Sequence, residues 1–153
     1  GTMWRSISDQ VMGGVSQGKV SRCATEDGPC LRLTGDVSVE NNGGFIQASL
    51  DLTEDGSALD AASFKGIRLV VRGNEETYGL HLRTGDVTRP WQSYRTEFSA
   101  EKDWNVVELP FSNFLPHRID APLNTHKLRR LGLVAIGRAF HADLSVKRLE
   151  FYR

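Results

Sequence analysis

Apolar and polar residues alternate with a period of two along most of this chain, a pattern typical of half-buried antiparallel strands. The clearest stretch, residues 66–99, predicts three consecutive strands whose apolar side chains would fill a core. We expect the three strands to be neighbours in one sheet, so that their polar side chains share an outer face that could serve as a binding platform. The candidate binding residues are Arg68, Arg72, Tyr78, His81, Arg83, Trp91, Tyr94 and Arg95.

The same alternation predicts further strands on both sides of this stretch. Residues 20–24 and 31–37 would form a hairpin around a turn at 27–29, and residues 45–52 would follow as a strand. The later candidates are residues 104–109, 131–136 and 140–152, the last with a bulge between Val146 and Leu149. Helical turns are expected at most within residues 53–65 and 124–130. Eight or nine short strands predict an all-β fold, a jelly-roll sandwich of two antiparallel sheets.

Length and composition narrow the class of protein further. The length of 153 residues is that of one domain, which we expect over residues 3–153. It starts at Met3 because Gly1 and Thr2 ahead of it resemble a remnant of cloning. Lys plus Arg and Asp plus Glu both total 19, and this zero net charge argues against a nucleic-acid partner. No apolar run approaches the roughly 18 residues that a membrane-spanning helix needs.

The sequence offers no catalytic or metal-binding motif. Its histidines (His81, His117, His126 and His141) are scattered without the spacing of metal ligands. No serine lies in a Gly-x-Ser-x-Gly motif. The acids Asp9, Glu97 and Glu108 are expected to be surface residues. We therefore expect a binding protein with no catalytic residue, no cofactor and no metal, and a jelly-roll hydrolase or lyase is the less favoured alternative.

The two cysteines, Cys23 and Cys30, lie on either side of the predicted turn at residues 27–29. We expect two free thiols in a reducing compartment. A disulfide between them is the alternative that the spacing leaves open.

Two groups of residues form short motifs, and we expect these residues to be structural. They are Trp4, Asp9, Met12, Gly13, Gly14 and Ser16 near the start, then Asn42, Gly43, Gly44 and Phe45. Together with Gly66-Ile67, Tyr78-Gly79-Leu80, Ser93-Tyr94 and residues 104–114, in this order, they resemble the motifs of the complex I intermediate-associated protein family, whose members are assembly factors for NADH:ubiquinone oxidoreductase. The chain departs from the family's pattern at residues 74–76, where the family usually has Asp-Gly.

The resemblance implies a galactose-binding-like jelly roll and a binding role without turnover. It implies a protein client, such as a subunit of a respiratory complex or another membrane-enzyme assembly intermediate. It also implies the cytoplasm for a bacterial member and the mitochondrial matrix for eukaryotic relatives. A carbohydrate-binding module is the second interpretation, in which Trp91, Tyr94 or Tyr78 would stack on a sugar ring while cations bond its hydroxyl groups.

Overall fold

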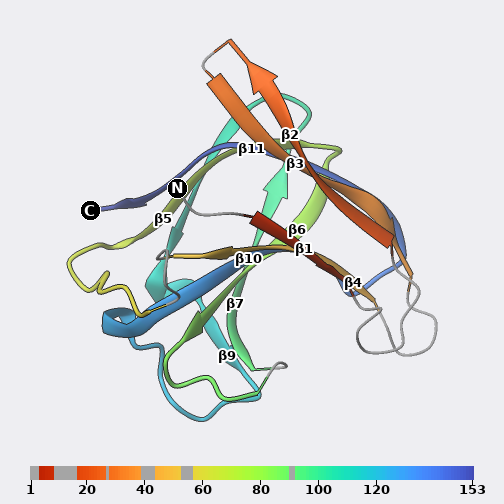
Figure 1. The fold of residues 1–153 in the computed structure, drawn as a ribbon. Helices are drawn as coiled ribbons and strands as arrows, with labels where there is room; N and C mark the ends of the chain where they lie inside the picture. The colour runs from red at the N-terminus through yellow and green to blue at the C-terminus, as the bar shows by residue number, and fades with distance from the viewer. Residues whose placement is uncertain (1–3, 9–16, 27, 39–43, 53–56, 90–91) are drawn as a thin grey trace.

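The computed structural model describes residues 4–8, 17–26, 28–38, 44–52, 57–89 and 92–153, whose strands form two antiparallel sheets (Figure 1). Sheet A has the order β1 (Trp4–Ser8), β4 (Phe45–Asp51), β10 (Leu128–Ile136), β6 (Glu76–Thr84), β7 (Ser93–Ala100) and β9 (Leu115–His117). Sheet B has the order β2 (Gln17–Thr25), β3 (Gly28–Val37), β11 (Phe140–Tyr152), β5 (Gly66–Gly73) and β8 (Asn105–Pro110). The predicted all-β jelly-roll sandwich is confirmed.

Apolar side chains from both sheets fill the space between them. The alternation on β6 directs Leu80 and Leu82 inward, opposite Leu133 and Leu131 of β10. Burying one such side chain stabilises the fold by about 1.5–3 kcal/mol. The largest fully buried aliphatic side chains are Leu33, Ile46, Ile67, Leu69, Leu80, Leu82, Leu128, Leu131, Leu133 and Leu144.

Local features agree with the sequence in most places. β11 shifts its register between Val146 and Arg148, which confirms the predicted bulge. Two short 3₁₀ helices, η3 (Phe111–Asn113) and η4 (Thr125–Lys127), follow β8 and precede β10. The edge strands β1 and β9 were not predicted, because each is too short for alternation to be visible and β9 contains Pro116. No helix within the described ranges is long and apolar enough to cross a membrane.

The chain changes sheets in the turn between β5 and β6. Gly73 lies at this corner, where an added Cβ would come within 2.7 Å of Ala100 Cβ and 2.8 Å of the Asp143 carbonyl oxygen. Glu75, two residues further along this turn, has a φ of 65° and donates its amide to the Ala100 carbonyl oxygen at 2.8 Å. Only glycine, which has no side chain, fits this close approach, so the turn that joins the two sheets depends on Gly73.

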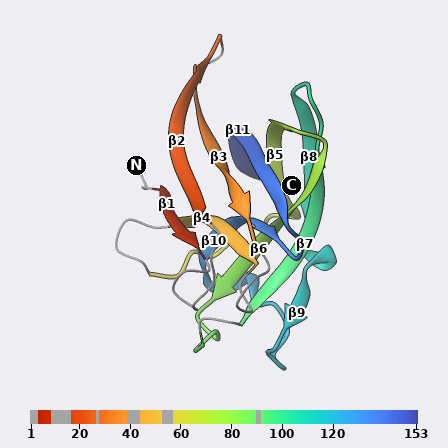
Figure 2. The ribbon, with the colours of Figure 1, turned by 90° about the vertical axis from the view of Figure 1, so that its right-hand side faces the viewer.

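The hairpin of β2 and β3 forms the edge of sheet B and extends past its neighbouring strands (Figure 2). Cys23 and Cys30 are directly opposite each other in this hairpin. They form a disulfide with a Cα–Cα distance of 4.8 Å. The expectation of two free thiols is therefore wrong, because strand pairing brings the two cysteines within the reach of an S–S bond.

Candidate functional site

The arginines expected on one platform lie on two different faces of the sandwich. Arg68 and Arg72 belong to β5 in sheet B. His81 and Arg83 on β6 and Arg95 on β7 belong to sheet A. The expectation of a single shared face is wrong, because β5 pairs with β8 and β11 instead of β6.

The two tyrosines of the predicted platform point into the core. Tyr78 is 1% exposed and Tyr94 is fully buried. The Tyr78 hydroxyl donates to Asn74 Oδ1 at 2.6 Å and accepts from the Asp143 amide at 2.9 Å, and burial raises the pKa of Tyr78 to about 12. The Tyr94 hydroxyl donates to the Ala121 carbonyl oxygen at 2.7 Å. The expectation that these rings face a ligand is wrong, and Trp91 lies outside the described residues.

Most of the motif residues lie outside the described ranges. Gly44 is buried, has a φ of 129° and accepts a hydrogen bond from the Gly137 amide, which is consistent with the structural role expected of it. Phe45 begins β4, and the backbone of Trp4 begins β1. The motif residues outside the described ranges are Asp9, Met12, Gly13, Gly14, Ser16, Asn42 and Gly43.

On the outer face of sheet B, Arg68 is held by acids on both neighbouring strands. It lies opposite Glu108 of β8 and Glu150 of β11. Its guanidinium bonds Glu108 Oε2 at 2.6 Å and Glu150 Oε1 at 3.3 Å. The hydrogen bond to Glu108 is the main cause that raises the pKa of Arg68. This arginine is matched within the fold.

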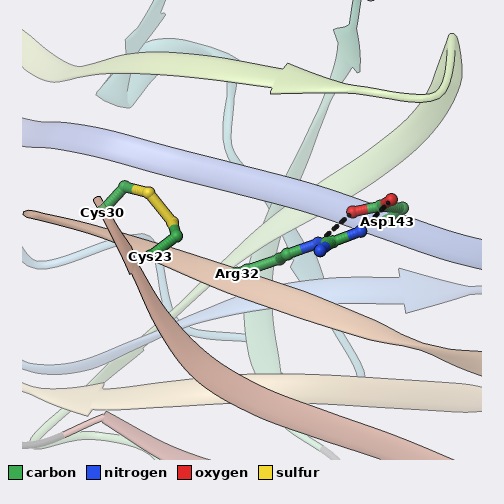
Figure 3. The surroundings of a disulfide bond; sticks show 4 residues. All are labelled: Cys23, Cys30, Arg32 and Asp143. Atoms are coloured by element: carbon green, nitrogen blue, oxygen red, sulfur yellow. Dashed lines mark hydrogen bonds and ion pairs between the residues drawn. A yellow bond between two sulfur atoms is a disulfide. The ribbon is translucent and has the colours of Figure 1, made fainter. Parts of the chain in front are cut away.

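Arg32 of sheet B is matched by an acid in a similar way, whereas Arg72 contacts an aromatic ring. Arg32 of β3 donates to both carboxylate oxygens of Asp143 on β11, at 2.9 and 2.7 Å (Figure 3). This bond raises the pKa of Arg32 and lowers that of Asp143. The Arg72 guanidinium lies 4.8 Å from the ring centroid of Trp104. Sequence reasoning missed Arg32, although the alternation over residues 31–37 already directed it outward.

The outer face of sheet A carries a second set of basic residues, which we call the basic patch: His81, Arg83, Arg95, His117 and Arg118. Strand register places Arg95 of β7 directly opposite His81 of β6. On the other side of β7, His117 of β9 lies opposite Ser93, which is the outward residue before Arg95. The Arg95 Nε donates to Ser93 Oγ at 2.8 Å, and an Nη of Arg83 donates to the Arg89 carbonyl oxygen at 3.2 Å.

The charged side chains of the basic patch lie mainly beside other cations. Burial lowers the pKa of Arg83, and Arg130 and Arg129 lower it further. Burial and then Arg118 lower the pKa of Arg95. Within the described parts of the chain, neither Arg83 nor Arg95 forms an ion pair with a carboxylate.

The surroundings of the two histidines of the basic patch disfavour their protonation. Burial is the largest cause that lowers the pKa of His81 to about 3, and the charges of Arg95 and His117 add to it. The pKa of His117 is lowered by burial and then by Arg95 and Arg118. The patch therefore disfavours any further positive charge.

The backbone around the basic patch limits where a ligand can approach. Toward β4 the outer face is closed, since Ser49 and Val134 are buried there. Toward β7 and β9 it carries Arg118, whose φ of 57° is unusual for a residue with a side chain. Glu97 lies exposed on the same face but forms no ion pair with a described residue. The accessible part of the patch is thus the half formed by β6, β7 and β9.

This arrangement suits the binding of anions. Two half-buried guanidinium groups present several N–H donors at fixed positions, and planar carboxylates match that geometry. No group of three or more His, Cys, Asp or Glu side chains in the described part of the chain could hold a metal ion.

The fold is that of known carbohydrate-binding modules. A family 11 carbohydrate-binding module from Clostridium thermocellum, solved with a β-1,3-1,4-mixed-linked tetrasaccharide, matches with a TM-score of 0.77 and 11% identity, over 97% of this chain and 88% of that chain. The family 30 module of a Clostridium thermocellum cellulosomal cellulase matches with a TM-score of 0.67 and 14% identity, over 90% of each chain. At these identities the likeness defines the fold alone.

Sequence comparison supplies the family. The model of the complex I intermediate-associated protein 30 family matches residues 2–146, and the chain belongs to that family. None of the curated proteins compared with the chain matches it. The name of this family refers to a complex I intermediate, and the titles of the two modules refer to carbohydrate binding.

Proposed function

We propose that this protein is a non-enzymatic binding module that holds a protein client during the assembly of a larger complex. Its contact with the client is the basic patch, and the segment that it recognises is acidic. The observation that carries the proposal is the state of Arg83 and Arg95, which are half-buried, directed outward and without a carboxylate partner in the described chain. Family membership supports the role in assembly.

Electrostatics explains why an acidic segment would bind there. Cations on adjacent strands repel one another, and half-burial removes part of the water that would screen them. Arg129 and Arg130 act on Arg83 in this way, and Arg118 acts on Arg95. A carboxylate bound beside Arg83 and Arg95 would offset this repulsion with charge-assisted hydrogen bonds, which are about twice as strong as neutral ones. The unusual φ of Arg118 holds a further cation beside this position.

The structure weakens the carbohydrate-binding alternative for this face. Binding to the face of a sugar relies on exposed aromatic rings, and both tyrosines proposed for that role are buried in the core. Arg68 and Arg72 also lie outside the proposed contact, since they are on sheet B. Because this alternative predicts binding of a neutral glycan, the test also measures that binding.

The test uses two double variants with the same change in net charge. Arg83→Glu with Arg95→Glu reverses the basic patch, while Lys19→Glu with Arg148→Glu reverses two exposed cations of sheet B. Each tagged protein is mixed with detergent-solubilised respiratory membranes, and complex I subunits in the captured fraction are quantified. We expect capture by the wild-type protein and by the sheet B variant, and loss of capture by the patch variant.

Two outcomes would contradict the proposal in distinguishable ways. Undiminished capture by the patch variant would reject the basic patch as the contact. Absence of complex I subunits from every sample, together with binding of mixed-linked β-glucan by the wild-type protein, would favour the carbohydrate-binding alternative. Circular dichroism and thermal melting of all variants establish that the charge reversals leave the fold intact.

A further inference from the structure

A groove with a volume of 320 Å³ lies on the outer face of sheet B, beside the disulfide. It is distinct from the basic patch, which is on sheet A. Residues from four elements of sheet B and from the β7–β8 connection meet in it. Those that matter chemically are Cys23, Arg32, Arg72, Lys102, Asp143 and Ser145.

The groove has an excess of positive charge. Arg32 and Asp143 neutralise each other through their two hydrogen bonds. Arg72 and Lys102 remain, and neither forms an ion pair with a carboxylate of the described chain. The Arg72 guanidinium is instead positioned by the ring of Trp104. An anion entering the groove would therefore meet two unmatched cations and the hydroxyl group of Ser145.

The two sulfur atoms of the disulfide differ in their access to this groove. Cys23 lines it and is partly exposed, whereas Cys30 does not line it and is 7% exposed. Figure 3 shows the bridge beside the Arg32–Asp143 pair, with one cysteine on each strand of the hairpin. A reagent bound in the groove would therefore reach the sulfur of Cys23 before that of Cys30.

We propose that the groove binds a small anionic thiol, which opens the disulfide at Cys23. The thiolate sulfur of the ligand forms a bond to Cys23 Sγ, and the bond between Cys23 Sγ and Cys30 Sγ breaks. Its electron pair leaves on Cys30 as a thiolate, which then takes up a proton from water. The products are a mixed disulfide between the ligand and Cys23 and a reduced Cys30, so atoms and electrons balance.

The surroundings of the bridge favour this exchange. Reactive sulfur sites in proteins are partly exposed and electropositive, because positive charge stabilises both the attacking and the leaving thiolate. Arg72 and Lys102 would hold the ligand's carboxylate or sulfonate group and raise its concentration beside Cys23. After exchange, backbone hydrogen bonds still join β2 to β3, but the covalent link at the outer end of the hairpin is lost. This proposal is independent of the proposed function.

The test compares one anionic and one neutral thiol as reagents. Glutathione and 2-mercaptoethanol are added to the oxidised wild-type protein at equal thiolate concentration, and opening of the disulfide is followed by alkylation and mass spectrometry. We measure the ratio of the two rate constants in the wild-type protein, in Arg72→Gln with Lys102→Gln, and in the control Lys19→Gln with Arg148→Gln. The control removes the same net charge from the same sheet outside the groove.

We expect the ratio to fall about fivefold in the groove variant, the size of one interaction between unit charges 4 Å apart in water. The ratio should be unchanged in the control variant, and high salt should reduce the wild-type ratio. Peptide mapping after an acid quench should place glutathione on Cys23. An unchanged ratio in the groove variant, an equal fall in the control, or glutathione on Cys30 would each overturn the proposal.

Discussion

The outer faces of sheets A and B both carry arginines, but their surroundings shift the arginine pKa values in opposite directions. On sheet B, acids on neighbouring strands raise the pKa of the guanidinium groups of Arg32 and Arg68. On sheet A, burial and neighbouring cations lower the pKa of Arg83 and Arg95. A net charge of zero for the whole chain conceals this difference.

The comparison shows which cluster of cations would be stabilised by binding an external anion. An arginine that already bonds carboxylates within the fold has little to gain from an external anion, and exposed ion pairs contribute at most about 1 kcal/mol to stability. Half-buried arginines next to other cations are destabilising until an anion arrives. The number of arginines on a face therefore says less about binding than the number left unmatched.

The first expected effect concerns the turn between β5 and β6, where the chain crosses from one sheet to the other. Gly73→Ala places a Cβ against Ala100 and the Asp143 carbonyl oxygen, and should lower the free energy of unfolding by about 2 kcal/mol. Gly85→Ala is the matched control, because its Cβ would meet only Lys127 at ordinary contact distances of 3.6 and 3.7 Å. Urea denaturation measures both. Equal stability of the two variants would contradict the role of Gly73 in the crossing between sheets.

This corner also marks the limit of what the sequence predicted. The alternation of apolar residues was sufficient for the sandwich, the bulge after Val146 and the inward direction of Leu80 and Leu82. Alternation describes one strand at a time, so it could not show that β5 and β6 lie in different sheets. The candidate site was therefore divided in two, with Arg83, Arg95 and His81 on one face and Arg68 and Arg72 on the other.

Other parts of the site were beyond the sequence for different reasons. The ion pair of Arg32 with Asp143 joins residues 111 positions apart, and only the pairing of β3 with β11 brings them together. Tyr78 lies at an inward position of its strand, so the alternation itself spoke against a surface role for its ring. His117 belongs to a strand of three residues, too short to carry a pattern.

The next effect concerns the response of the basic patch to acid. The pKa of His81 is lowered to about 3 in the folded chain from 6.5, the ordinary value of a histidine, so the unfolded chain binds the proton first as the pH falls. The free energy of unfolding should therefore fall by about 2 kcal/mol between pH 7 and pH 5 on account of this one histidine. The loss should continue down to about pH 3 and then level off.

A histidine replacement separates this contribution from that of other groups. His81→Gln should flatten the decrease in stability between pH 7 and pH 5, measured by denaturation at each pH. His126→Gln replaces an exposed histidine that pairs with Asp60 and serves as the control. A slope that is as steep in His81→Gln as in the wild-type protein would show that His81 is not held neutral by its surroundings.

The smallest effect is a difference in sign between the two faces. Arg95→Met removes a repelled cation and should raise the free energy of unfolding by less than about 1 kcal/mol, whereas Arg32→Met breaks an ion pair and should lower it by a similar amount. Both changes should shrink at high salt, because salt screens charges that solvent can reach. Changes of the same sign in both variants would contradict the comparison between the faces.

The central claim, that an acidic segment binds to the basic patch, is tested most directly by nuclear magnetic resonance. The protein is titrated with a peptide rich in Asp and Glu and, separately, with its Asn and Gln counterpart. The account predicts that only the acidic peptide shifts the amide signals of β6, β7 and β9, and that it raises the pKa of His81 and His117. Shifts confined to β5, β8 and β11, or equal shifts with both peptides, would contradict it.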